Sequence, residues 1–189
     1  MSKATMNHAI IRTLTCSIIV CLLGGTSAAM AAPQDHSPAL IRLLSAIDIV
    51  PTPDQLEEAT GQVPEDELMA VALDASLVEY LRSRATSMLS MFPSARSALH
   101  LETIARSVAG LSIRWMAVYT RVRAFGDSAA VRFAEKTFSS PVTRLRHASA
   151  RALRWVPGDE ATKALQAQLD RESDSQLRKT IQRMLRLRR

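Results

Sequence analysis

A short motif that recurs every 32 residues is the strongest constraint on how this chain folds. An aliphatic residue followed by arginine occurs four times at unchanged spacing, at Leu81-Arg82, Ile113-Arg114, Leu145-Arg146 and Leu177-Arg178. Small or apolar residues follow each arginine at three, six and seven positions, and only Arg121 replaces the expected leucine. Spacings of three, four and seven place these residues on one face of a helix. A regular period of this length indicates stacked supersecondary units.

Chain-breaking residues separate the helical runs at corresponding places in each repeat. Proline or glycine follows three of the motif helices, at Pro93, Gly126 and Pro157, and both residues interrupt helices. Each unit is therefore predicted to be a helical hairpin. First helices are predicted at 96–107, 128–138 and 160–169, and second helices in the windows 80–93, 112–125, 144–157 and 176–189.

Composition favours helices over strands. Of 189 residues, 47% are hydrophobic but only 4% are aromatic. A chain this apolar is not expected to be disordered. Abundant Ala, Leu, Arg and Met with few aromatic residues is typical of helices. We predict an all-α protein of one domain, or of two small ones at most.

Helix starts also precede the repeats. Thr52 and Gln55 have the spacing of a capping box, with Pro53 at the first helical position, and Gly61 is placed to end that short helix. Pro64 begins the next helix, with acidic residues in its first turn. The first unit of a repeat array exposes apolar surface unless it is covered. We therefore interpret residues 32–63 as an acidic helical cap and residues 64–189 as the repeat array.

Residues 1–31 have the three-part layout of a secretory signal peptide. Lys3 and Arg12 precede an apolar run at 13–23, and small residues follow it. Cleavage is expected after Ala31, and the mature chain is expected to be periplasmic or secreted with no membrane span. An uncleaved anchor is the alternative, but eleven apolar residues are fewer than the roughly 20 that cross a bilayer. Both cysteines lie in this segment, so the mature chain lacks disulfides and thiolate metal sites.

The repeat resembles the short HEAT-like repeat of the phycobilin-lyase type, in which an aliphatic residue and arginine open the second helix. The resemblance covers about residues 64–187 and is best at 145–153. It implies a short α-solenoid of about four hairpins behind an N-terminal cap, with the second helices lining the concave side. Family units also carry an acidic residue six positions before the arginine. Here only Glu172 does so, which leaves a regular acid–arginine ladder in doubt.

Charge is divided unevenly along the chain. Residues 32–79 hold ten acidic residues against Arg42, a net charge of −9, while residues 80–189 hold 21 basic and eight acidic residues, a net charge of +13. The four second-helix windows contain 15 basic residues and no acidic one. Together with the resemblance, this predicts a basic groove that attracts anionic partners.

Two sets of arginines have different expected roles. The four motif arginines recur in every unit, so we interpret them as structural, each bonded to a neighbouring hairpin: Arg82, Arg114, Arg146 and Arg178. Four others occur in only some units and are the candidate partner-binding residues: Arg151, Arg154, Arg183 and Arg186. An alternative interpretation of residues 186–189 is a frayed, solvated end.

Catalytic and cofactor motifs are missing from the sequence. The mature histidines, His36, His100 and His147, form neither His-Glu dipeptides nor i, i+4 pairs, so no metal and no cofactor is predicted. Trp115 and Trp155 stand at helical spacing with several methionines and are interpreted as core or inter-repeat packing. Arginine-rich helices suit nucleic acid electrostatically, but an exported protein is not expected to meet it.

These patterns predict a non-enzymatic interaction module of the cell envelope, whose basic surface binds an acidic protein segment or a polyanion. One alternative is a purely structural protein in which the acidic N-terminal region docks on the basic helices. The other alternative, an enzyme or enzyme accessory of the bilin-lyase type, comes from the resemblance alone, and a fold does not carry an activity.

Overall fold

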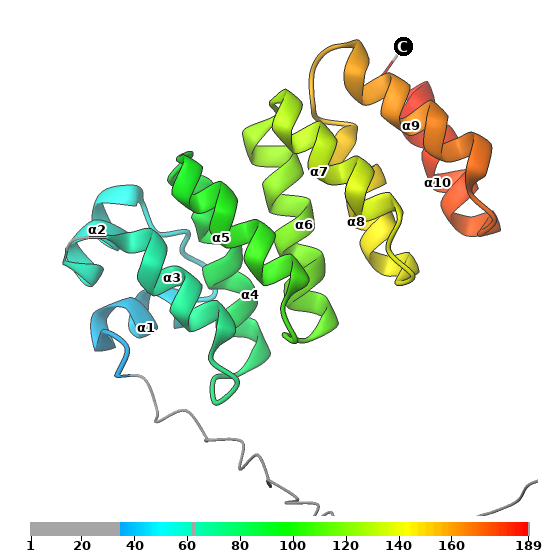
Figure 1. Ribbon diagram of the computed structural model, residues 1–189. Coiled ribbons are helices and arrows are strands. Elements are labelled where there is room, and N and C mark those ends of the chain that lie inside the picture. Colours follow the sequence, from blue (N-terminus) through cyan, green and yellow to red (C-terminus); the bar gives the residue numbers. More distant parts are fainter. Residues whose placement is uncertain (1–34, 62, 189) are drawn as a thin grey trace, which may run out of the picture. The chain divides into compact units, whose positions relative to one another are not determined.

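The computed structural model describes residues 35–61 and 63–188, and this part of the chain is helical without strands (Figure 1). The all-α prediction is confirmed. The predicted signal peptide and Arg189 lie outside the described residues. None of the described helices is both long and apolar enough to cross a membrane. In chain order the elements are α1 (Pro38–Ser45), α2 (Pro53–Thr60), α3 (Pro64–Leu73), α4 (Glu79–Met88), the 3₁₀ turn η1 (Leu89–Met91), α5 (Ala95–Arg106), α6 (Leu111–Phe125), α7 (Ser128–Phe138), α8 (Thr143–Leu153), α9 (Asp159–Arg171) and α10 (Ser175–Arg186).

Local signals determine where the first helices begin and end. Thr52 and Gln55 form the predicted capping box at the start of α2, and Pro53 is its first residue. Gly61 ends α2 with a φ of 85°, a left-handed conformation that glycine adopts without steric cost. Pro64 opens α3 with three acidic residues in the first turn, where they interact favourably with the helix dipole.

The helices of the repeat region contact one another in two series. Within each predicted hairpin, the two helices pack together: α3 with α4, α5 with α6, α7 with α8 and α9 with α10. The second helices also contact the next second helix in the chain, α4 with α6, α6 with α8 and α8 with α10. Among the first helices, α3 contacts α5 and α7 contacts α9. Each second helix therefore has both its own first helix and its neighbouring second helices as partners.

The repeated apolar positions form the core. The aliphatic residue before each motif arginine is at most 9% exposed in every copy: Leu81, Ile113, Leu145 and Leu177. The residues three positions after the arginines are completely buried: Ala85, Ala117, Ser149 and Ile181. Burying one leucine or isoleucine side chain stabilises the fold by about 1.5–3 kcal/mol. The periodic face recognised in the sequence is thus the packed face of each helix.

Arg121 is the exception in this core. It stands where the other repeats have leucine and is only 3% exposed. Its Nε donates a hydrogen bond to Glu102 Oε1 at 3.3 Å, and its guanidinium lies 4.9 Å from the centre of the Phe125 ring. Nη1 approaches Asp127 at 3.5 Å but makes no hydrogen bond. A buried charge with an incomplete set of partners stabilises a fold less than an apolar side chain of similar volume.

We predict that Arg121→Leu raises the free energy of unfolding by about 1 kcal/mol or more, because it replaces a buried, partly bonded guanidinium with the residue of the other repeats. Arg121→Ala is the matched control, and it should be destabilising because it leaves a cavity. Urea unfolding of both variants measures the difference. A leucine variant less stable than the wild-type protein would contradict the prediction.

Candidate functional site

The exposed face of the second helices carries aromatic and basic side chains at equivalent positions of successive repeats. In α6, α8 and α10, together with the turns that follow the last two helices, residues at i, i+4 and i+8 form a face that is partly or fully exposed. None of these nine is buried: Trp115, Tyr119, Arg123, His147, Arg151, Trp155, Lys179, Arg183 and Leu187. We call them the basic–aromatic surface. The equivalent positions of the first unit are uncharged, Ser83, Ser87 and Met91.

A hollow of about 450 Å³ opens in this surface between α6, α8 and α10. Arginine, histidine and aromatic side chains form most of its lining, with Thr180 and Met184 at one side: Tyr119, His147, Arg151, Arg154, Trp155 and Arg183. We call it the main hollow. A second hollow of about 340 Å³ lies next to it and shares His147 and Arg151 with it. Neither lining includes an acidic residue.

Aromatic rings hold two of the guanidinium groups at this surface. The Arg154 guanidinium lies 4.5 Å from the centre of the Trp155 ring. Arg123 lies 5.4 Å from the same ring and 5.7 Å from the ring of Tyr119. Tyr119 in turn stacks on Trp115, with ring centres 5.1 Å apart and planes 9° apart. Stacking restricts the guanidinium planes but leaves their N–H groups free to donate.

The main hollow brings together three of the four arginines predicted to bind a partner. Arg151, Arg154 and Arg183 line it, whereas Arg186 is exposed outside its lining. Within residues 35–61 and 63–188, none of these four side chains takes part in a hydrogen bond or an ion pair with another residue. Their charges are therefore uncompensated by the described part of the chain, and their role in binding stays a prediction.

Sequence reasoning missed the aromatic part of this surface. Trp155 is 51% exposed and is not a core residue, although Arg123 of the preceding hairpin lies over its ring. Trp115 and Tyr119 are half-buried and pack against the core. The signal was available in principle, because the i, i+4, i+8 spacing within a helix and the 32-residue period between helices together define one exposed face.

Within the part of the chain that the structure describes, no acidic side chain of the N-terminal region forms an ion pair with a second helix, although Arg84 of α4 donates to the Ile49 carbonyl. Among the described residues, ion pairs from acids of the 35–79 region join Asp74 to His36, and Asp66 to Arg96 and His100. All three partners lie outside the second-helix windows. The bases of those windows that do form ion pairs, Arg121 and Arg146, pair with acids beyond residue 79, namely Glu102, Asp127 and Glu172.

Three motif arginines bond within their own hairpin, not to a neighbouring one as expected. Arg82 donates to the carbonyl of Ala72 at 3.1 Å, Arg114 to that of Ala105 at 3.0 Å and Arg178 to that of Leu169. These carbonyls belong to the last turn of the first helix in the same hairpin, where no N–H group of that helix remains to bond them. The repeated arginine thus caps the helix before it.

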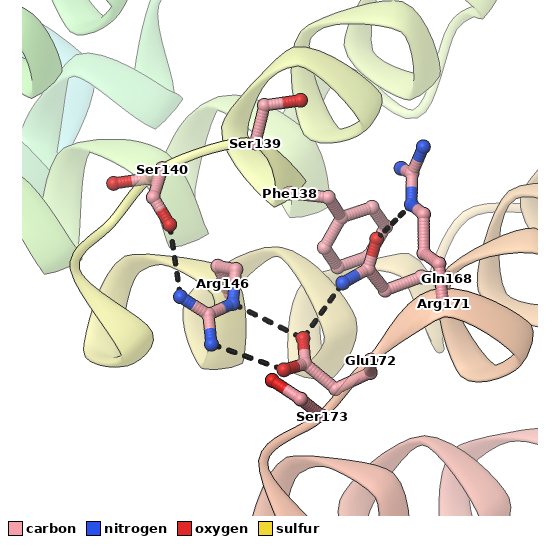
Figure 2. A pocket seen from close by; sticks show the side chains of 8 residues that line it. All are labelled: Phe138, Ser139, Ser140, Arg146, Gln168, Arg171, Glu172 and Ser173. Atoms are coloured by element: carbon pink, nitrogen blue, oxygen red, sulfur yellow. Dashed lines mark hydrogen bonds and ion pairs between the residues drawn. The ribbon is translucent and has the colours of Figure 1, made fainter.

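Arg146 connects two hairpins (Figure 2). Its Nη1 donates to the Ser140 carbonyl at 2.9 Å, while Nε and Nη2 bind the two carboxylate oxygens of Glu172 at 3.0 Å each. Gln168 donates to the same carboxylate at 2.7 Å. Burial raises the pKa of Glu172, but hydrogen bonds from Arg146, the Asp174 amide and Gln168 outweigh burial and lower the pKa to about 2.

Arg188 closes the C-terminal end of the repeat region. Its guanidinium donates to the carbonyls of Leu153, Val156 and Gly158, and its Nε donates to the hydroxyl of Thr162 at 3.0 Å. These carbonyls belong to the turn that carries Arg154 and Trp155. A frayed end is therefore the wrong interpretation for Arg188, and this side chain holds a turn that contributes to the main hollow.

The arginine side chains at this surface are hydrogen-bond donors. Burial lowers the pKa of His147, and Asp174 opposes this while Arg151 and Arg146 add to it, so at neutral pH the ring is uncharged between basic neighbours. In the part of the chain that the structure describes, no three His, Cys, Asp or Glu residues are grouped to hold a metal ion. Guanidinium recognition of oxyanions is the chemistry that these side chains support.

Glu172→Gln should lower the free energy of unfolding by about 3 kcal/mol at pH 7, because it leaves the buried Arg146 charge without its partner. The wild-type carboxylate has a lowered pKa, so its contribution is complete above about pH 5 and is lost as the pH falls towards 2. The difference between the two proteins should therefore shrink over that interval in urea unfolding. A difference independent of pH would contradict this account.

Arg188→Met should lower the free energy of unfolding by about 1.5–3 kcal/mol, because several carbonyls and one hydroxyl lose a charged donor. Arg186→Met is the matched control two residues earlier, and its exposed side chain should change stability by less than about 0.5 kcal/mol. Thermal unfolding of both variants measures the effect. Equal stability of the two variants would show that the Arg188 contacts do not stabilise the turn.

Comparison with known proteins identifies no family for this chain. No protein-family model matches the sequence, and no curated protein matches it. The likeness to HEAT-like repeats rests on the four motif copies themselves.

Proposed function

We propose that this chain is an exported binding module of the cell envelope, built as a short α-solenoid of HEAT-like hairpins. In this proposal the basic–aromatic surface holds an acidic protein segment or a polyanion. Export is inferred from the signal-peptide layout of residues 1–31, which places the mature chain in the periplasm or outside the cell. Neither a cofactor nor catalysis is part of this proposal.

The helix contacts support the solenoid. Successive second helices touch in chain order, α4 to α6 to α8 to α10, and each also packs on its own first helix. In a repeat array each unit contacts only its neighbours, which agrees with this order. Because the units repeat every 32 residues, equivalent positions recur on one side of successive second helices.

One observation carries the binding function: three uncompensated arginines line a single hollow. Arg151, Arg154 and Arg183 are half-buried or exposed around the main hollow and have no acidic residue among its lining. Bringing three like charges together is unfavourable by Coulomb's law. A bound anion removes this repulsion, and the unpaired cations raise the rate at which anions arrive.

The two alternatives have less support. A self-docked structural protein requires ion pairs between the acidic N-terminal region and the second helices, and the described residues form none. An enzyme of the bilin-lyase type requires more than a similar repeat. No contact among the described residues favours it.

The test is heparin chromatography of charge-matched variants. The double substitution Arg151→Ser with Arg183→Ser should weaken binding about tenfold at moderate salt, since it removes two donors from one anion site. The control pair is Arg132→Ser with Lys163→Ser, which removes the same charge from exposed positions of α7 and α9. Equal retention of the two variants would refute the proposed site, because net charge alone would then explain binding.

A further inference from the structure

We infer that the main hollow is a site for a phosphate monoester carried on a sugar ring. This inference rests on the proposed function, and it names the chemical group that the surface recognises. Carboxylates and sulfate esters are the competing anionic groups. The number of guanidinium groups in the lining and the contrast with Arg146 favour the phosphate.

The bond between Arg146 and Glu172 shows what one carboxylate needs from an arginine in this protein. A single guanidinium binds both carboxylate oxygens at 3.0 Å, and Gln168 and the Asp174 amide each add one further donor. One arginine and two neutral donors thus satisfy the planar group. The main hollow presents three guanidinium groups, more than one carboxylate requires.

A phosphate monoester matches three guanidinium groups in charge and in shape. It carries about −1.5 to −2 charges at pH 7 and three terminal oxygens that accept hydrogen bonds from several directions. A sulfate ester has the same tetrahedral shape but only one negative charge. Arg151 and Arg154 come from α8 and the residue that follows it, and Arg183 comes from α10, so guanidinium groups from two neighbouring second helices line the same hollow.

The two acidic side chains whose charges act on His147 are already engaged in hydrogen bonds within the chain. Asp174 and Glu172 are the carboxylates whose charges act on His147 at the edge of the hollow. Asp174 accepts a hydrogen bond from the Leu177 amide at 2.8 Å and caps α10. Glu172 is held by Arg146. The three arginines of the hollow therefore remain available to an external anion.

The aromatic side chains favour a phosphate that is attached to a ring. Trp155 is half-exposed in the lining of the hollow, and Tyr119 of α6 also lines it. A cavity of about 450 Å³ exceeds the volume of a phosphate group alone. It is large enough for one sugar residue. The apolar face of the sugar can pack against an aromatic side chain, since ligand pockets are commonly lined by aromatic residues.

The experiment compares three ligands that share one ring and differ in the anionic group: glucose 6-phosphate, glucose 6-sulfate and glucuronate. The chain contains two tryptophans, Trp115 and Trp155, and both belong to the basic–aromatic surface, so tryptophan fluorescence reports binding. Glucose 6-phosphate should bind at least about tenfold more tightly than the other two, because the additional charge interacts with three guanidinium groups. Equal affinity for the three ligands would overturn the inference.

Two variants test whether the preference for phosphate depends on the arginines of the main hollow. Arg154→Lys keeps the charge but removes the planar fork of donors, and it should reduce the preference for phosphate over sulfate. The Arg132→Ser and Lys163→Ser control pair should leave that preference unchanged. If heparin retention depends on Arg151 and Arg183 but the three sugars bind equally, the phosphate site is wrong and the proposed function stands. If heparin retention is also independent of those arginines, the proposed function is wrong.

Discussion

The rest of this structure depends on the agreement between two periods, the α-helical period of about 3.6 residues and the 32-residue period of the repeat. Each 32-residue unit returns the chain to a second helix with the same face buried, so Leu81, Ile113, Leu145 and Leu177 all lie in one core. A helix that buries one face exposes the opposite one. The same agreement therefore places side chains four residues apart in α6, α8 and α10 on one continuous exposed surface, where the main hollow forms.

Arginine has several different roles in this fold, and the environment decides between them. Arg82, Arg114 and Arg178 complete the hydrogen bonding of helix ends. Arg146 joins two hairpins through Glu172, and Arg188 holds the turn after α8. Arg151, Arg154 and Arg183 have no hydrogen-bond or ion-pair partner among the described residues, and these three line the proposed anion site. Residue type and charge alone do not distinguish these roles, because each depends on which carbonyls and carboxylates lie within reach.

Local signals were sufficient to predict much of the fold. Helical periodicity, the capping box at Thr52 and the breakers at Gly61 and Gly126 depend on residues close in sequence, and the structure has helices at these places. The exposure of Trp155 and the contacts of Arg188 were not predicted. Both depend on the turn between α8 and α9, where residues more than 30 positions apart meet. Contacts between residues so far apart in the sequence produce no local spacing pattern from which they could be predicted.

The sequence by itself determined that this chain is helical, where its hairpins begin, and that its basic residues concentrate in the second helices, because all three follow from residue type and spacing. Only the tertiary structure decided which arginines bond to carbonyls or to Glu172 and which, among the described residues, have no partner around the main hollow. The physical reason is that a charge is compensated by whatever lies within a few ångströms of it in space. For Arg146 and Glu172, which are 26 residues apart, packing of the hairpins creates that proximity.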